Sequence, residues 1–175
     1  YDPYAYPMQF TEQEQKQFEN GICYSIYEKL GAHPVKIDGV SGVYFAVWAP
    51  NAIRVSVVGN FNNWDGRAYQ MNLLESGIYE LFIPGVRAGD IYKYEIKARG
   101  GLTYLKSDPY ANAAQLRPNN ASVVFDLGKY AWQDENWMKK RGVAQSDKAP
   151  ISVYEVHLGS WKKPDDGREF YNYRE

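Results

Sequence analysis

Ile91-Tyr92-Lys93-Tyr94-Glu95-Ile96-Lys97-Ala98 is the stretch that decides the fold of this 175-residue chain. Apolar or aromatic side chains alternate along it with charged ones, which is the pattern of a β-strand with one buried and one solvated face. The pattern predicts that Tyr92 and Tyr94 face a core, while the charged side chains between and after them face outward.

Similar short runs lie on both sides of this strand. Strands are predicted at residues 43–49, 53–58, 78–83, 102–105 and 122–127. Turn-forming residues separate them, for example Ala49-Pro50-Asn51 and Ser76-Gly77. Short alternating strands at this spacing predict a mainly β protein, an antiparallel β-sandwich or barrel, with its core spanning residues 37–128.

A helical arm is expected before the sandwich, over residues 1–36. Thr11 stands three residues before Glu14, which is the spacing of a capping box, so a helix should begin there. Apolar residues at helical spacing from Ile22 to Leu30, followed by Gly31, predict one broken helix or two short ones over residues 11–31. His33 is then expected at the end of this helical region.

The pattern changes again after the sandwich. Residues 129–149 predict a short helix that begins near Asp134 and is capped by Gly142, followed by a linker. Ile151–Leu158 is apolar on both faces, as in a strand of a buried parallel sheet. Because little sequence follows that strand to supply its neighbours, we expect residues 150–175 to be the start of a truncated domain, poorly ordered alone.

Bulk composition excludes several function classes. A net charge of -1 offers no basic surface for nucleic acid, and no apolar run approaches the ~20 residues needed to span a membrane. The single cysteine, Cys23, excludes an internal disulfide and fits a reducing compartment. The two histidines and Cys23 lie far apart and give no metal signature, and no glycine-rich phosphate loop occurs. We therefore expect neither a metal nor a cofactor.

The segment Val57–Gly66 is the best candidate for a functional site. A strand-like run ends at Gly59, and a cluster of amides then presents one tryptophan, Trp64, in a turn. The amides of Asn62 and Asn63 can bond sugar hydroxyls, and an indole has a flat apolar face that can stack on a pyranose ring. The alternative is that Trp64 is a core plug that closes one end of the sandwich.

Several segments together resemble the N-terminal region of bacterial 1,4-α-glucan (glycogen) branching enzymes of the α-amylase superfamily. They are Phe45–Ala52, Val55–Gly66, Ser76–Gly85, Leu105–Tyr110, Ala149–Trp161 and Tyr173–Glu175. The resemblance implies an immunoglobulin-like β-sandwich, a carbohydrate-binding module of the isoamylase N-terminal type. It also implies that Ile151–Leu158 is the first strand of a (β/α)8 catalytic barrel.

The resemblance further implies an activity for the full-length protein in cytoplasmic glycogen biosynthesis. Such enzymes are glycosyltransferases that cleave an α-1,4 glucan bond and rejoin the chain in α-1,6 linkage by a retaining mechanism with two carboxylates. Both carboxylates belong to later barrel strands, so no catalytic residue is assigned here and the chain alone should be inactive. The implied partners are α-glucans, such as glycogen and maltooligosaccharides, and a C-terminal catalytic domain, with no nucleic acid and no membrane.

The resemblance also implies roles for particular residues. In related glycogen-binding modules the residue matching Trp64 stacks on glucose, and the one matching Lys93 bonds a sugar hydroxyl. Asn120 is either a second hydroxyl partner or a turn former, and Tyr104 is a looser candidate for a second aromatic platform. Two alternatives stay open: a structural sandwich that supports the barrel without binding glucan, and a free-standing module.

Glu155 and His157 are a tempting acid/base pair, because residues two apart on a strand share one face. No nucleophile lies nearby, and barrel chemistry occurs beyond the C-terminal ends of the strands. Both are therefore expected to be buried, hydrogen-bonded structural residues.

Overall fold

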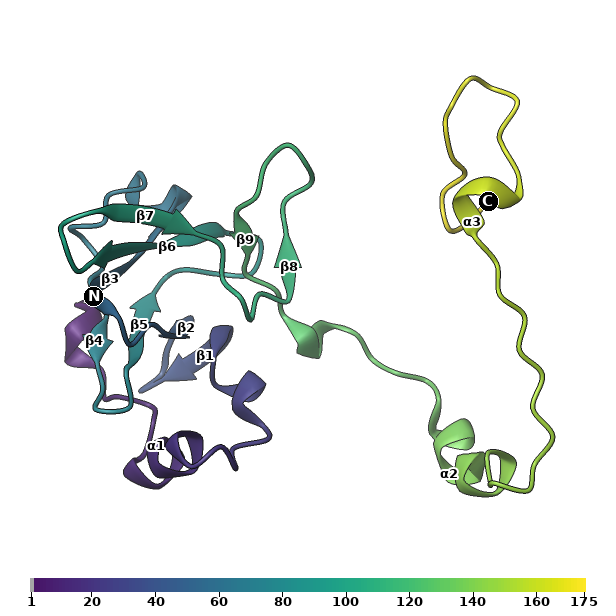
Figure 1. Ribbon diagram of the computed structural model, residues 1–175, viewed down its shortest axis with the longest axis horizontal. Coiled ribbons are helices and arrows are strands. Elements are labelled where there is room, and N and C mark those ends of the chain that lie inside the picture. The colour runs from purple at the N-terminus through teal and green to yellow at the C-terminus, as the bar shows by residue number, and fades with distance from the viewer. Residues whose placement is uncertain (1) are drawn as a thin grey trace. The chain divides into compact units, whose positions relative to one another are not determined.

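The computed structural model describes residues 2–175, which divide into two compact units, one ending at Tyr130 and the other comprising Ala131–Glu175. The first unit holds two antiparallel sheets (Figure 1). The first sheet has the order β1 (Gly31–Ile37), β2 (Val40–Trp48), β5 (Ile78–Pro84) and β4 (Asn72–Leu73). The second sheet has the order β3 (Ala52–Gly59), β6 (Ile91–Ala98), β9 (Ser122–Val123) and β8 (Ala113–Ala114), and β7 (Thr103–Lys106) also pairs with β6.

The two sheets pack face to face around one core, which confirms the mainly β, antiparallel prediction. Tyr92 and Tyr94 of β6 are fully buried, as the alternation in their strand predicts. Phe45 of β2 meets Tyr92 edge to face, with ring centroids 5.0 Å apart, so side chains of both sheets interlock. Most of the remaining members of this core come from β2, β3 and β5, and they include Val43, Val47, Val55, Val57, Leu81 and Ile83.

The N-terminal arm covers the outer face of the first sheet. The arm contains two short elements, η1 (Pro3–Ala5) and α1 (Glu12–Glu19). The helix α1 begins with the predicted capping box: the Glu14 backbone N–H donates to Oγ1 of Thr11 at 3.2 Å, and the Thr11 N–H donates to Oε2 of Glu14 at 2.8 Å. A second apolar cluster joins this arm to the sheet, and it contains Phe10, Leu30, Tyr44, Ala46, Leu74, Ile78 and Phe82. Strand β2 is therefore buried on both faces.

A buried carboxylate fixes the arm in place. Glu80 of β5 is only 1% exposed and accepts a hydrogen bond from the hydroxyl of Tyr44 at 2.5 Å. It also accepts backbone N–H donors from Gln9 and Phe10, both in the arm, at 3.1–3.3 Å. These donors compensate much of the cost of burying an ionisable group.

The predicted helix over residues 22–31 is wrong. Only one 3-10 turn forms there, η2 (Ile26–Glu28), and Gly31 is the first residue of β1. Strand β1 pairs along its whole length with β2, with Gly31 opposite Ala46 and Ile37 opposite Val40, so tertiary pairing decides the structure from Gly31 onward. His33 is consequently a strand residue rather than a helix end, and Pro34 is tolerated because β1 is an edge strand.

The end of the sandwich also differs from the expectation in detail. The last strand, β9, is two residues long rather than the six expected over 122–127, and a 3-10 turn, η4 (Leu127–Lys129), follows it. The two-residue strands β4 and β8 have no alternating pattern from which the sequence could predict them.

The second unit contains two short helices, α2 (Glu135–Ala144) and α3 (Leu158–Trp161). The predicted helix is confirmed, but it continues through Gly142 and is capped at Gln145. The predicted strand over residues 151–158 is wrong, because 151–157 have no regular secondary structure. A parallel strand needs hydrogen-bonded neighbours, and this unit contains no other strand.

Glu155 and His157 are exposed, which corrects the expectation that both are buried. The Nδ1 atom of His157 lies 2.7 Å from the Ser160 hydroxyl, in the first turn of α3. No helix among residues 2–175 has the length and apolar character needed to cross a bilayer.

Candidate functional site

The amide-rich turn after β3 has an unusual backbone. Strand β3 ends at Gly59, one 3-10 turn follows, η3 (Asn60–Asn62), and the next two residues adopt left-handed conformations. The φ angles are 54° at Asn63 and 61° at Trp64. The backbone N–H of Trp64 donates to the carbonyl of Gly59 at 3.0 Å, which closes the turn back onto the end of the strand.

Asn62 is the clamp of this turn. Its Oδ1 accepts the Gly59 backbone N–H at 2.9 Å, and its Nδ2 donates to the carbonyls of Val57 and Asp65 at 3.0 and 3.2 Å. Both polar ends of the amide are therefore engaged by the backbone. The structure thus gives Asn62 a positioning role, whereas the amide of the neighbouring Asn63 is exposed and makes no hydrogen bond to another described residue.

Trp64 is displayed rather than buried. The residue is 37% exposed, which argues against the core-plug alternative. Positive φ at a bulky side chain is sterically unfavourable and persists only where the surroundings impose it. The turn therefore holds an exposed indole at a cost in conformational free energy. Strain of this kind marks Trp64 as a candidate ligand contact.

The turn lies on the outer face of the second sheet. Gly66 is buried, and a Cβ added to it would stand closer than 3.0 Å to the Cδ and both carboxylate oxygens of Glu95 in β6. Glu95 also forms an ion pair with Arg54 of β3. Because residues two apart on a strand share a face, Lys93 emerges from the same face as Glu95.

Lys93 and Asn120 are brought together by the fold. The ammonium of Lys93 donates to Oδ1 of Asn120 at 2.5 Å, and Asn120 belongs to the loop between β8 and β9. In the β3–β6 register Lys93 lies opposite Val58 and Tyr92 opposite Gly59, the residue that accepts the Trp64 N–H. The Trp64 turn, Lys93 and Asn120 thus share one end of one sheet face.

Tyr104 occupies the other face of the second sheet. It lies on β7 opposite Ile96 of β6, so it is on the core side, and it remains 43% exposed at the sheet edge. The ammonium of Lys106 lies 5.6 Å from the centroid of its ring. Tyr104 is therefore separate from the group formed by the Trp64 turn, Lys93 and Asn120.

One exposed apolar residue near the site was missed from the sequence. Leu116 is 89% exposed in the loop that carries Asn120. The signal that could have found it is a single leucine within an otherwise polar, turn-rich segment, Gln115–Asn120. The roles of Gly66 and Glu95 carry no comparable signal, because their contact joins residues distant in sequence.

The electrostatics of the turn are dominated by Asp65 and Arg67. The guanidinium of Arg67 donates three hydrogen bonds to the Asp65 carboxylate, at 2.9, 3.2 and 2.7 Å, and lowers the pKa of that carboxyl to about 2. Asp65 therefore stays ionised as a hydrogen-bond acceptor at any physiological pH. Among residues 2–175 no group of three potential metal-ligating side chains is close enough to hold an ion.

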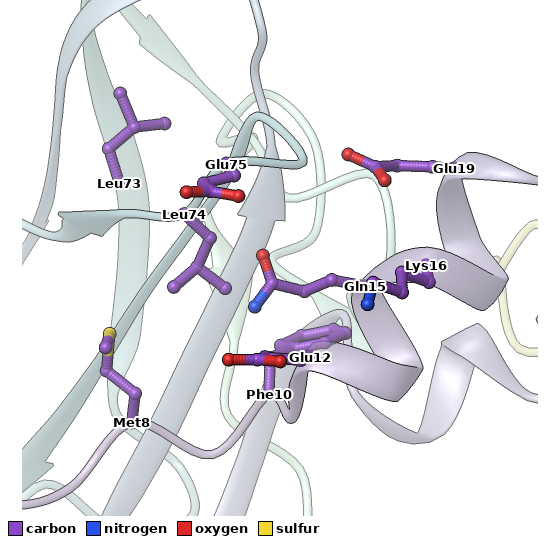
Figure 2. A pocket seen from close by; sticks show the side chains of 9 residues that line it. All are labelled: Met8, Phe10, Glu12, Gln15, Lys16, Glu19, Leu73, Leu74 and Glu75. Atoms are coloured by element: carbon purple, nitrogen blue, oxygen red, sulfur yellow. The ribbon is translucent and has the colours of Figure 1, made fainter.

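A separate groove of about 490 Å³ lies between α1 and the β4–β5 hairpin (Figure 2). Its floor includes the buried Phe10 and Leu74, and its walls include Met8 and Leu73, each 59% exposed. Its other lining residues are polar, Glu12, Gln15, Lys16, Glu19 and Glu75. The groove has no exposed aromatic ring on which a sugar could stack, so it is a poorer candidate for a glycan than the Trp64 turn.

Comparison with known proteins gives a consistent result. Residues 29–111 match the family described as carbohydrate-binding module 48 (isoamylase N-terminal domain). The chain is 53% identical over 91% of its length to the 1,4-alpha-glucan branching enzyme GlgB of Synechococcus sp. (strain JA-3-3Ab), and 50% identical over its full length to that of Cellvibrio japonicus (strain Ueda107). It spans only 21% and 24% of those two relatives.

Proposed function

We propose that this chain, which carries a carbohydrate-binding module 48 domain and corresponds to the N-terminal region of the 1,4-alpha-glucan branching enzymes, binds α-glucan chains at the Trp64 turn. Trp64 is the stacking platform. Lys93 and Asn120 are the hydroxyl partners, and the exposed amide of Asn63 borders them. Asn62 supports the turn from beneath.

The observation that carries this proposal is the exposed, left-handed Trp64 on the same sheet face as the Lys93–Asn120 pair. An indole face offers an apolar surface to sugar C–H groups, while an ammonium and an amide oxygen offer one donor and one acceptor for hydroxyls. A glucan hydroxyl can replace the direct bond between Lys93 and Asn120 by accepting from the ammonium and donating to the amide oxygen. Both protein groups then stay satisfied.

In the longer protein, the module would hold glucan chains near a catalytic domain that cleaves α-1,4 bonds and forms α-1,6 bonds. Binding at two linked sites raises the effective concentration of the chain at the second site. A cytoplasmic role in glycogen synthesis is part of this proposal.

The test is calorimetric titration of this chain with maltoheptaose, with Trp64→Ala beside the wild type. Truncating a central aromatic contact should weaken binding by roughly tenfold or more. Trp161→Ala is the matched control, because Trp161 is 66% exposed but lies in the second unit. Equal affinity in wild type and Trp64→Ala would move the site elsewhere, with Tyr104 as the next candidate.

A second function is favoured by one observation, the groove between α1 and the β4–β5 hairpin. Its exposed Met8 and Leu73 suit packing against another protein surface, as a scaffold for the catalytic domain requires. In that case the folded chain binds no maltoheptaose, and Leu73→Ser lowers the melting temperature of the longer protein. An unchanged melting temperature would exclude this groove as the supporting contact.

A further inference from the structure

The contact between Gly66 and Glu95 has a consequence for Trp64. We infer that the Arg54–Glu95 ion pair is a seat that holds Trp64 in its exposed position, and that Gly66 is the residue whose small size permits the contact. The inference rests on the proposed function in so far as this position serves glucan binding. It makes Arg54, Glu95 and Gly66 positioning residues, none of which needs to touch the sugar.

Gly66 and the Glu95 carboxylate are in close contact. Gly66 is buried, and a Cβ there would overlap the Glu95 carboxylate where it now stands beside Arg54, so an alanine would require that carboxylate to move. The φ of Gly66 is not in the left-handed range, so the turn conformation itself does not require glycine here. The requirement comes from the approach of the backbone to Glu95.

An ion pair between two strands holds the Glu95 carboxylate in this position. Glu95 and Arg54 lie on the adjacent strands β6 and β3, and their side chains are only 18% and 28% exposed. A partly buried ion pair between two strands of one sheet is screened less than a surface pair. Moving the Glu95 carboxylate away from Gly66 therefore disturbs its ion pair with Arg54.

Two polar groups beside the ion pair are buried and unpaired. Among residues 2–175 the hydroxyl of Ser56 and the Nε of Arg54 are buried without a hydrogen-bond partner. Ser56 lies opposite Glu95 in the β3–β6 register and is 0% exposed. Burying polar groups without partners lowers the stability of the fold. The stability of the fold alone therefore does not explain why the Trp64 turn covers this face of the sheet so closely.

Restraints lie on both sides of Trp64. Asn62 bonds the backbone of Val57 and Gly59 before Trp64 and the carbonyl of Asp65 directly after it, and Gly66 meets Glu95 one residue further along. Two consecutive left-handed residues, Asn63 and Trp64, lie between these anchors. A strained segment persists when both of its ends are held, and releasing one end allows it to relax.

The test uses the 175-residue chain labelled with 5-fluorotryptophan, whose five tryptophans report separately by fluorine NMR. The Trp64 resonance is assigned by its absence in Trp64→Phe. Gly66→Ala should move or broaden that resonance alone and weaken maltoheptaose binding by roughly tenfold. The double variant Gly66→Ala/Glu95→Ala should bind no worse than Glu95→Ala, since removing the carboxylate removes the overlap.

Gly42→Ala is the matched control for loss of stability. A Cβ at Gly42 would overlap the backbone carbonyl of Ile83 and the ring of Phe82, both in the first sheet and away from Trp64. Gly42→Ala should lower the melting temperature and leave both the Trp64 resonance and the affinity unchanged. If Gly66→Ala does not fold, Glu95→Gln replaces it, because it keeps the side-chain size and removes the ion pair; the Trp64 resonance should again change.

The outcomes separate this inference from the proposed function. An unmoved Trp64 resonance overturns the inference, and so does a moved resonance with wild-type affinity. If the wild-type chain binds no maltoheptaose, the proposed function fails. The fluorine spectrum then decides the inference by itself, with a moved resonance supporting the seat and an unmoved one refuting it.

Discussion

Lys93 and Asn120 are 27 residues apart in sequence, yet the ammonium of one donates to the amide oxygen of the other at 2.5 Å. The loop that carries Asn120 is tied back to the sheet by the Ser107 hydroxyl, which donates to the Asn120 carbonyl. The pair is therefore a preformed donor and acceptor rather than two independent surface groups.

Replacing either partner should weaken glucan binding without unfolding the chain. We expect Lys93→Met and Asn120→Ala each to reduce maltoheptaose affinity by roughly threefold to tenfold, the range for loss of one net hydrogen bond. Calorimetric titration measures this. Lys97→Met is the control, because Lys97 shares the outer face of β6 but lies four residues further along. An equal loss of affinity in Lys97→Met would mean that the positive charge of this sheet face, and not the Lys93–Asn120 pair, attracts the glucan.

The neighbouring asparagines of the turn should respond differently to substitution. Asn62→Ala removes three hydrogen bonds to the backbone and should lower the free energy of unfolding by about 1–3 kcal/mol, as measured by urea denaturation. Asn63→Gly keeps the left-handed backbone accessible and should leave the free energy of unfolding within about 0.5 kcal/mol of wild type. A stable Asn62→Ala variant would refute the clamp.

Alkaline pH should unfold the sandwich through its buried tyrosines. Burial raises the pKa of Tyr44, Tyr92 and Tyr94 above the ordinary value, and the nearby carboxylates of Glu80 and Asp108 raise it further. The folded state thus keeps these protons while the unfolded state loses them from about pH 10. The contribution of these tyrosines to the free energy of unfolding is complete below that pH. Above it, the free energy of unfolding falls by about 1.4 kcal/mol per pH unit for each tyrosine.

Urea denaturation at pH 8, 10 and 11 checks this dependence. Tyr92→Phe should make the free energy of unfolding fall less steeply above pH 10, by the contribution of one tyrosine. Tyr24→Phe should not change this slope, because Tyr24 is 85% exposed. A flat stability profile between pH 8 and 11 would contradict the prediction.

The segment at 151–157 should be the least protected apolar stretch of the chain. It forms no strand here, and Ile151 and Val153 are 87% and 83% exposed. Amide hydrogen exchange at these residues should be close to that of an unstructured peptide, while the amides of β6 should exchange by slow opening of the sandwich. Equal protection in both segments would show that the second unit forms stable structure by itself.

Sequence patterns predicted the sandwich well where one strand face is buried and the other is solvated. The alternation in β6 correctly assigned Tyr92 and Tyr94 to the core, and the spacing of Thr11 and Glu14 correctly placed the start of α1. These signals are local, because side-chain period and capping geometry involve residues within a few positions of one another.

The sequence failed where a segment's structure depends on a distant partner. Residues 22–31 have helical spacing, but pairing with β2 makes Gly31 the first residue of a strand. Ile151–Leu158 has the composition of a buried strand, but its own unit, residues 131–175, holds no strand to pair with it. In both cases the backbone hydrogen bonds available from other segments decide the outcome, and periodicity does not report them.

For the candidate site, the sequence alone determined which chemical groups are present: an indole within a turn, amides beside it, and a lysine on the outward face of a strand. Only the tertiary structure decided that Lys93 meets Asn120, that Asn62 supports the turn, and that Gly66 rests on Glu95. The physical reason is that residue type and short-range spacing are properties of the chain. Contacts between distant residues arise only when strand register and loop closure bring them within bonding distance.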